Sequence, residues 1–233
     1  MKKTAVISGS TRGIGFAAAK KLISDGIDIV LSARHTKELQ EKIEELNRLN
    51  GGKAYGYACD FSQTHSIVNF AQTILKKHSP VSILINNVGS YIEDTVFSED
   101  IISNAEQLFR INVLSAVQLT HLLIQDMISQ PQAHIINIGS VLSENSRPNS
   151  SSYTISKHAL LGFSKSLRED LKNTGVQITD ILPESVNTSS WDGIDAPKDK
   201  FIQPEEIALL ISDILKMDHS AVEMVKIKNR LFI

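Results

Sequence analysis

Seven short runs rich in β-branched residues recur along this chain, and stretches with helical periodicity separate them. Because these runs are apolar at successive positions, they predict strands that are buried on both faces by helices. Strands that alternate with helical crossovers pair in parallel, through right-handed connections. The chain therefore predicts an α/β fold: a doubly wound, mostly parallel sheet of about seven strands with helices on both of its faces.

The expected elements can be placed by residue number. The strands are expected at residues 4–8, 27–33, 54–58, 82–86, 134–138, 176–182 and 223–227. The helices are expected to begin near Ile14, Thr36, Ser62, Ala105, Ser152 and Gln203. Since no linker or repeat divides the chain, we expect a single domain over residues 1–233, with a short substrate loop around 189–202.

Composition narrows the kinds of partner. Lys and Arg number 24 against 26 Asp and Glu, and the two signs are interspersed, so no basic stripe for nucleic acid or anionic lipid is expected. No apolar run approaches the ~18 residues that cross a bilayer, and the first residues lack the pattern of a signal peptide. Cys59 is the single cysteine, so no disulfide can form within these residues. These features predict a cytoplasmic protein with a small-molecule partner and no membrane.

A glycine-rich loop follows the first expected strand and opens the first expected helix. It reads Gly9-Ser10-Thr11-Arg12-Gly13-Ile14-Gly15. Glycines let the backbone approach a ligand closely, and the helix amino terminus offers N–H groups and partial positive charge to phosphates. This context is typical of the Rossmann-type fold and predicts a dinucleotide site; the alternative is a purely structural turn.

The second expected strand ends at Ala33-Arg34, without the carboxylate that commonly binds the adenosine ribose. An arginine fork suits a 2′-phosphate instead, and Arg12 could approach the same group from the glycine loop. We therefore expect NADP(H) rather than NAD(H); the alternative is that both arginines are solvated surface charges. Asp60 follows the third strand, where it could receive the adenine amino group or cap the next helix.

Tyr153 and Lys157 are four residues apart on an expected helix, so phenol and ammonium lie on one face. An ammonium ~4 Å from a phenolate, at an effective dielectric of about 20, stabilises it by roughly 4 kcal/mol. The pair predicts a tyrosine whose pKa is lowered from about 10 and that acts as a proton donor. Ser140, thirteen residues upstream, could hydrogen-bond the same substrate oxygen.

Taken together, these motifs resemble those of the classical short-chain dehydrogenases/reductases over nearly the whole chain. The matching residues are the glycine loop, Asp60, Asn86-Asn87-Val88-Gly89, Asn112, Ser140, Tyr153, Lys157 and Pro183 through Thr188. The resemblance implies that Tyr153 protonates the carbonyl oxygen while Ser140 positions it. It also implies that Lys157 binds the nicotinamide ribose and that Asn112 kinks a helix and retains a water of the proton relay.

The expected cofactor-binding residues come from the glycine loop and from the ends of later strands. They are Gly9, Ser10, Thr11, Arg12, Gly13, Ile14, Gly15, Arg34, Asp60, Asn86, Gly89, Tyr153, Lys157, Pro183, Val186 and Thr188. Asn87 is expected to be structural. No metal site is indicated, because the histidines have no partners at metal-ligand spacing.

The chain departs from the family pattern at Pro183-Glu184, where the family commonly has Pro-Gly. We hypothesise that Glu184 lines the substrate pocket and disfavours anionic substrates; the alternative is an outward, solvated glutamate. The expected substrate residues are Ser140, Val141, Leu142, Tyr153 and Glu184, with Tyr91 beside them. Trp191 either lines the same pocket or anchors the substrate loop by packing.

The resemblance implies an enzyme, an NADP(H)-dependent oxidoreductase that interconverts a carbonyl and a secondary alcohol. Its direction is expected to be reductive, as in 3-oxoacyl-carrier-protein reductases. The alternative is a non-catalytic NADP(H)-sensing or regulatory protein of the same fold, against which the intact proton-relay residues argue. A nucleotide-sugar epimerase is disfavoured, because too few residues follow Thr188 for a substrate domain. The family pairs two of its helices across two-fold axes, which implies a homodimer or homotetramer.

Overall fold

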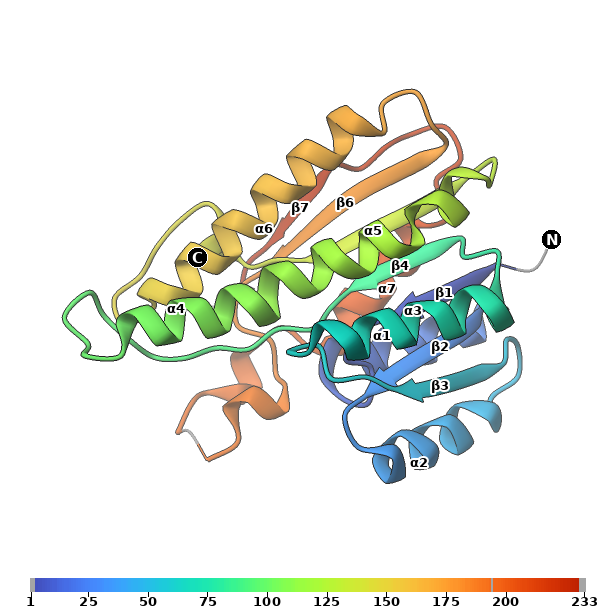
Figure 1. Ribbon diagram of the computed structural model, residues 1–233. Helices are drawn as coiled ribbons and strands as arrows, with labels where there is room; N and C mark the ends of the chain where they lie inside the picture. The colour runs from blue at the N-terminus through green and yellow to red at the C-terminus, as the bar shows by residue number, and fades with distance from the viewer. Residues whose placement is uncertain (1–2, 194, 231–233) are drawn as a thin grey trace.

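The computed structural model describes residues 3–193 and 195–230 (Figure 1). Its strands are β1 (Thr4–Ile7), β2 (Asp28–Ala33), β3 (Ala54–Ala58), β4 (Ile83–Asn86), β5 (Ala133–Ile138), β6 (Val176–Pro183) and β7 (Met224–Ile227). They form one seven-stranded sheet in the order β3-β2-β1-β4-β5-β6-β7, and every neighbouring pair is parallel. The predicted Rossmann-type sheet is confirmed.

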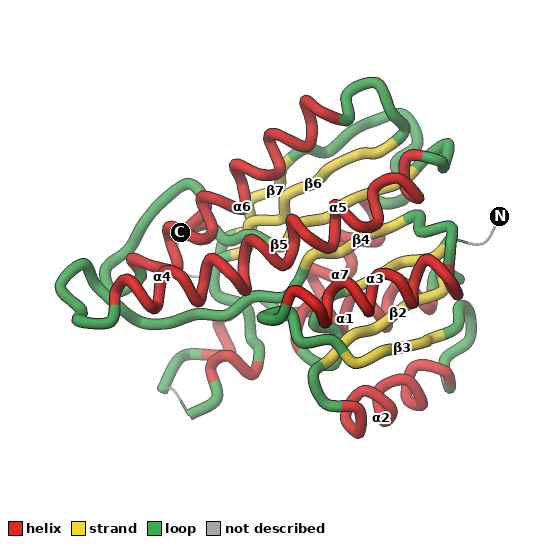
Figure 2. The backbone as a smooth tube through the Cα atoms, in the orientation of Figure 1, coloured by secondary structure: helices red, strands yellow, loops and turns green. Residues whose placement is uncertain are grey.

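The helices lie in two layers, one on each face of the sheet (Figure 2). They are α1 (Gly13–Ser24), α2 (Thr36–Asn47), α3 (Thr64–His78), α4 (Ile101–Phe109), α5 (Ser115–Ile128), α6 (Ser151–Asp170) and α7 (Pro204–Ile214). One face packs against α1, α2 and α7, and the other against α3, α5 and α6. The predicted helix starts are within a few residues of these bounds.

Strand side chains alternate between the two helical layers. In β1, Ala5 and Ile7 join the core beneath α1 and α7, whereas Val6 joins the core beneath α3 and α5. In β2, Ile29 and Val30 divide between the two cores in the same way. The strands are apolar at successive positions because a parallel sheet that helices cover on both faces has no solvent-exposed face.

The strand order reverses direction between β1 and β4. After β1 the chain moves outward through β2 and β3, and α3 then returns it to β4 on the other side of β1. Ligands of such sheets bind in the crevice outside the carboxyl ends of the strands at this switch point. The glycine loop follows β1, residues 87–89 follow β4, and Ser140 follows β5, so all three lie along this edge.

The helix expected to begin near Ala105 begins at Ile101 and is interrupted. A π-helical segment, Arg110–Leu114, separates α4 from α5 and includes Asn112. The periodicity of the sequence did not reveal this segment, because a single inserted residue leaves the apolar pattern on either side intact.

The continuous span Ile101–Ile128 is, among the described residues, long and apolar enough by length and composition to cross a membrane. This stretch is more apolar than the sequence analysis allowed. Core helices of soluble proteins meet the same criterion, and Leu119, Leu123 and Met127 are fully buried against the sheet.

Candidate active site

The glycine loop has the backbone geometry of a phosphate cradle. Gly9 and Gly13 have φ of +63° and +55°, a region that side chains disfavour. A Cβ on Gly15 would lie 2.6 Å from the Gly9 carbonyl oxygen. Arg12 precedes α1 without a side-chain cap, so the first N–H groups of α1 have no side-chain acceptor there. The loop therefore fits the diphosphate of a dinucleotide.

Ser10 turns into the protein and holds the glycine loop against β2. Its hydroxyl donates to the Ile7 carbonyl at 3.0 Å and accepts from the Ser32 N–H at 2.9 Å. The Ser32 hydroxyl in turn accepts from the Gly9 N–H at 3.1 Å. Ser32 is therefore a loop-shaping residue that the sequence analysis missed, since its partners are more than twenty residues away.

Asn87 braces the same loop from β4, in agreement with its expected structural role. Its Nδ2 donates to the carbonyls of Ser8 and Gly9 at 2.9 and 2.7 Å. Asn86 is buried, and its Nδ2 donates to Thr120 and Asn137. Its Oδ1 is buried with no hydrogen-bond partner. An orphaned buried acceptor at the switch point is consistent with a site whose ligand completes its hydrogen bonding.

Arg12 and Arg34 are exposed beside the glycine loop and at the end of β2. Asp60 lies near Arg34 and is engaged locally: the backbone N–H and hydroxyl of Ser62 donate to its Oδ1 at 2.9 and 2.8 Å. These bonds, together with the charge of Arg34, hold the pKa of Asp60 below its usual value. The structure thus places one exposed arginine in the glycine loop and one at the end of β2, and it places Asp60 in a turn with Ser62.

Tyr153 lies in the first turn of α6 with its phenol facing Ser140, after β5. Burial raises the pKa of Tyr153 to about 12, while the hydrogen bond of Ser140 and the charge of Arg147 act in the opposite direction. The expectation of a phenol acidified by Lys157 is wrong in this structure. The reason is that loss of water disfavours the phenolate by more than its neighbours stabilise it.

Lys157 is buried beside the tyrosine ring. Its Nζ lies 5.6 Å from the centre of the Tyr153 ring and donates to the Ile138 carbonyl at 2.9 Å. Burial lowers the pKa of Lys157 to about 8. A Cβ on Gly89 would lie 3.6 Å from this Nζ, so the glycine leaves the space beside the lysine open.

Asn112 joins the π-helical segment to the site. Its Oδ1 accepts from the Ser90 N–H at 2.7 Å, and its Nδ2 donates to the Ser90 carbonyl and to the Ser156 hydroxyl. The side chain thus ties the strand-β4 loop to α6, which carries Tyr153 and Lys157. π-Helical turns occur frequently at functional sites, which agrees with this placement.

The segment after β6 lies against the glycine loop. A Cβ on Gly13 would lie 3.1 Å from Thr188 Cγ2, so Thr188 faces the start of α1. Val186 is buried and bridges to Ile202, and the Ile202 N–H donates to the Ser185 carbonyl at 3.0 Å. The predicted loop around 189–202 is therefore pinned at both of its ends.

Glu184 and Trp191 have structural contacts. Glu184 Oε2 accepts from the Asn229 N–H at 2.8 Å, which directs its carboxylate to the segment after β7 and gives no support to the substrate-pocket hypothesis. The Trp191 ring lies 4.8 Å from that of Phe201, as expected of a packing anchor. Of the other predicted substrate residues, Leu142 is buried and Val141 is half-buried, in the 3₁₀ turn that Ser140 caps.

Tyr91 lies beside Tyr153, and Arg147 lies beside Tyr91. The Tyr91 ring meets the Tyr153 ring edge to face, with centres 5.1 Å apart. The Arg147 guanidinium lies 5.6 Å from the centre of the Tyr91 ring. Arg147 was missed by the sequence analysis, because a lone arginine in a polar loop carries no motif.

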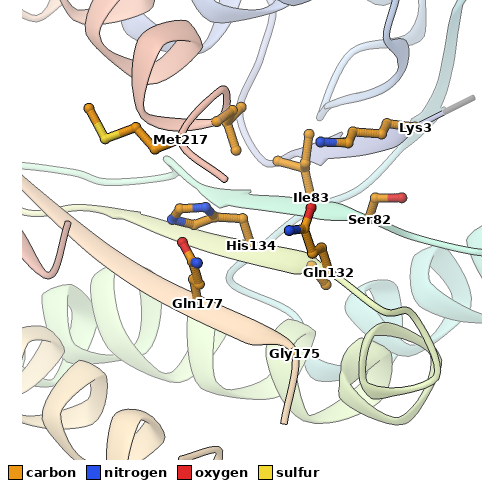
Figure 3. Close-up of a pocket in the computed structure, with 10 residues that line it drawn as sticks. Lys3, Ser82, Ile83, Gln132, His134, Gly175, Gln177 and Met217 are labelled. Carbon is orange, nitrogen blue, oxygen red and sulfur yellow. The ribbon is translucent and has the colours of Figure 1, made fainter. Parts of the chain in front are cut away.

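A separate pocket lies at the opposite edge of the sheet (Figure 3). It is lined by residues at the amino ends of β1, β4, β5 and β6, among them Lys3, Ser82, His134 and Gln177. His134 Nε2 lies 2.8 Å from Thr179 Oγ1, and burial lowers the pKa of His134 to about 4. Since the glycine loop and Tyr153 lie at the carboxyl ends of the strands, this pocket is distinct from the candidate active site.

The fold and the site together define a dinucleotide-binding oxidoreductase. Residues 3–199 match the family model described as short chain dehydrogenase, and the chain belongs to that family. Among curated relatives, it is 30% identical to the 3-oxoacyl-acyl-carrier-protein reductase FabG of Buchnera aphidicola, over 89% of this chain and 87% of that protein. It is 31% identical to the uncharacterized oxidoreductase YvrD of Bacillus subtilis, over 78% of this chain and 68% of that protein.

Solved structures give the same fold. A metagenomic short-chain oxidoreductase in complex with NADP is 29% identical, with a TM-score of 0.82 over 97% of this chain and 96% of that chain. The L-sorbose reductase of Gluconobacter frateurii, in complex with NADPH and L-sorbose, has a TM-score of 0.89 over 98% of this chain and 95% of that chain at 23% identity. The predicted family and fold are thus confirmed.

Proposed function

We propose that this protein is an NADP(H)-dependent reductase that converts a carbonyl to a secondary alcohol. The observation that carries the proposal is a grouping at the carboxyl edge of the sheet: the Tyr153 phenol faces Ser140, and the buried Lys157 Nζ lies 5.6 Å from the centre of the Tyr153 ring. Burial raises the pKa of Tyr153 to about 12, and a phenol in this place can give a proton to a carbonyl oxygen as hydride adds to the carbonyl carbon, which is the reductive direction.

The residues present fit a dinucleotide. The glycine loop and the amino end of α1 would hold the diphosphate, Arg12 and Arg34 the 2′-phosphate, and Lys157 the nicotinamide ribose. Asp60, Asn86, Gly89, Pro183, Val186 and Thr188 would line the remainder of that site. When bound, NADPH would supply the hydride that adds to the carbonyl carbon.

Side chains of this protein protonate the carbonyl oxygen of the substrate and hold it in position. As the carbonyl π electrons move onto that oxygen, Tyr153 Oη gives it a proton, and Ser140 Oγ donates a hydrogen bond that fixes its position. The ammonium of Lys157 balances the negative charge that develops on the phenol. Asn112 holds α6 and the strand-β4 loop in register, so these groups keep their relative positions.

The name of the Buchnera relative supports a 3-oxoacyl thioester as one candidate substrate. The segment around 189–202 follows Thr188, which faces the start of α1, and we propose that it forms the substrate loop. We further propose a homodimer or homotetramer in the cytoplasm. The exposed apolar side chains of Phe97, Ile102 and Ile155, which are 92%, 70% and 53% exposed, support an assembly through this region.

Cofactor preference is tested by fluorescence titration with NADPH and NADH. We expect tighter binding of NADPH, and we expect Arg34→Ala to weaken NADPH binding at least tenfold while leaving NADH binding within twofold, because only NADPH carries the 2′-phosphate. Equal affinities of the native protein for the two cofactors would refute the preference.

Turnover is tested with a panel of aldehydes, ketones and 3-oxoacyl thioesters. We expect Tyr153→Phe to lower kcat by roughly 10²-fold or more, since general acid catalysis contributes about 10²–10⁴-fold, without changing the Kd for NADPH. A protein that binds NADPH but reduces none of these compounds would instead be the non-catalytic sensor.

A further inference from the structure

The guanidinium of Arg147 lies against the ring of Tyr91, which packs on Tyr153, and it has no carboxylate partner in the described chain. Arg147 belongs to the loop between the 3₁₀ turn of Ser140 and α6. Its guanidinium carbon lies 5.6 Å from the centre of the Tyr91 ring, and that centre lies 5.1 Å from the centre of the Tyr153 ring. The distance from the Arg147 guanidinium carbon to the centre of the Tyr153 ring is therefore no greater than these two distances together.

The loop that carries Arg147 is held in place. Arg147 Nε donates to the buried Ser150 hydroxyl at 3.1 Å, and the Tyr91 hydroxyl donates to the Asn149 carbonyl at 2.9 Å. The Asn149 backbone has φ of +56°, a conformation that sharpens the turn before α6. Because the Nε contact and the ring of Tyr91 orient the guanidinium, less side-chain entropy is lost when it binds a ligand.

Two acidic side chains of this region, Glu93 and Glu144, are engaged with other partners. Glu93 Oε1 accepts from Asn149 Nδ2 at 3.1 Å, and Glu144 pairs with Lys226 at 2.5 Å. Within residues 3–193 and 195–230, Arg147 forms no ion pair, and its two terminal nitrogens make no hydrogen bond. Its charge is nevertheless felt at the reacting group, since it opposes the burial that raises the pKa of Tyr153.

We propose that Arg147 binds a carboxylate of the substrate, so that this protein reduces oxo acids, whose carbonyl lies at Tyr153 and whose carboxylate meets the guanidinium fork. The inference rests on the proposed reductase function and names its substrate class. A carboxylate accepts two parallel N–H bonds from a guanidinium, which gives both attraction and orientation. The carboxylate of Glu184 is directed to the segment after β7, where it accepts from the Asn229 N–H at 2.8 Å.

The experiment compares acids with their neutral esters. The probes are 4-oxopentanoate, 5-oxohexanoate, their methyl esters and the neutral N-acetylcysteamine thioester of 3-oxobutanoate, each with NADPH. For the native protein we expect kcat/KM to favour at least one acid over its methyl ester by tenfold or more. Arg147→Gln is expected to lower kcat/KM for that acid by roughly tenfold to a hundredfold, mainly through KM, and to leave its ester within twofold.

Two variants serve as comparisons. Arg147→Lys keeps the charge but not the fork, so it should recover only part of the loss. Arg48→Gln removes an exposed arginine after α2 and should leave the acid-to-ester ratio unchanged. Thermal unfolding of each variant checks that the fold is intact.

Several results would overturn the inference. These are equal kcat/KM for acids and esters in the native protein, a parallel loss on both in Arg147→Gln, or a preferred thioester whose turnover Arg147→Gln does not change. In all three cases carbonyl reduction itself persists. If none of the compounds is reduced although NADPH binds, the proposed function fails together with its substrate class.

Discussion

Replacing Lys157 by methionine measures the cost of burying an ammonium beside the candidate catalytic tyrosine. Lys157 is 4% exposed, and burial lowers its pKa from 10.5 to about 8. Because the unfolded chain binds this proton more tightly than the folded one, the ammonium destabilises the fold at every pH below about 8. The cost falls as pH rises from 8 to 10.5, where the lysine is neutral in the folded protein.

The size of the burial cost follows from the pKa shift of Lys157. One pKa unit corresponds to about 1.4 kcal/mol, so the full cost at pH 7 is roughly 3 kcal/mol, and less than about 1 kcal/mol of it remains at pH 10. Methionine has a similar length and no charge. Methionine cannot donate the hydrogen bond that Lys157 makes to the Ile138 carbonyl, and the loss of this bond offsets about 1–2 kcal/mol of the stability gained by removing the charge. We expect Lys157→Met to be more stable than the native protein at pH 7, with an advantage that shrinks by roughly 2.5 kcal/mol between pH 7 and pH 10.

Urea unfolding at both pH values tests this expectation. Lys165→Met removes an exposed lysine from the same helix and should show no comparable change with pH. Turnover of Lys157→Met should be lost even though its stability rises, as expected of a residue kept for function. A stability difference that is the same at pH 7 and pH 10 would refute the argument from burial.

Two further expectations concern pH and the carboxyl-terminal segment. The rate of carbonyl reduction should fall above pH 8 with the loss of a single proton, because Lys157 loses its charge near 8 while Tyr153 stays protonated to about 12; a pH profile of kcat that stays flat to pH 10 would contradict this. Glu184→Ala removes the acceptor of the Asn229 N–H and should lower the free energy of unfolding by about 1–3 kcal/mol, or several degrees in Tm. In the same variant the ratio of kcat/KM for neutral ketones to kcat/KM for acidic ketones should stay within twofold of the native ratio. A larger change would show that Glu184 acts in the substrate pocket.

The structure also separates what spacing can predict from what burial decides. The family resemblance implied a helix kink at Asn112 but not its π-helical form, and the spacing of Tyr153 and Lys157 did not give the direction of the tyrosine's pKa shift. The spacing identifies one favourable neighbour of the phenolate, the ammonium of Lys157. The loss of water around the phenol acts in the opposite direction, and it depends on how α6 packs against the strand ends.

The sequence by itself determined the features that depend on neighbours along the chain. The alternation of doubly buried strands with helices gave the parallel sheet, the glycines after β1 gave the phosphate cradle, and a spacing of four put Tyr153 and Lys157 on one face of α6. Only the tertiary structure decided the contacts between distant segments: Ser32 with the glycine loop, Glu184 with Asn229, and Arg147 beside Tyr91. The physical reason is that hydrogen bonding and burial act through space, and chain folding brings together residues whose separation in sequence leaves no periodic signal.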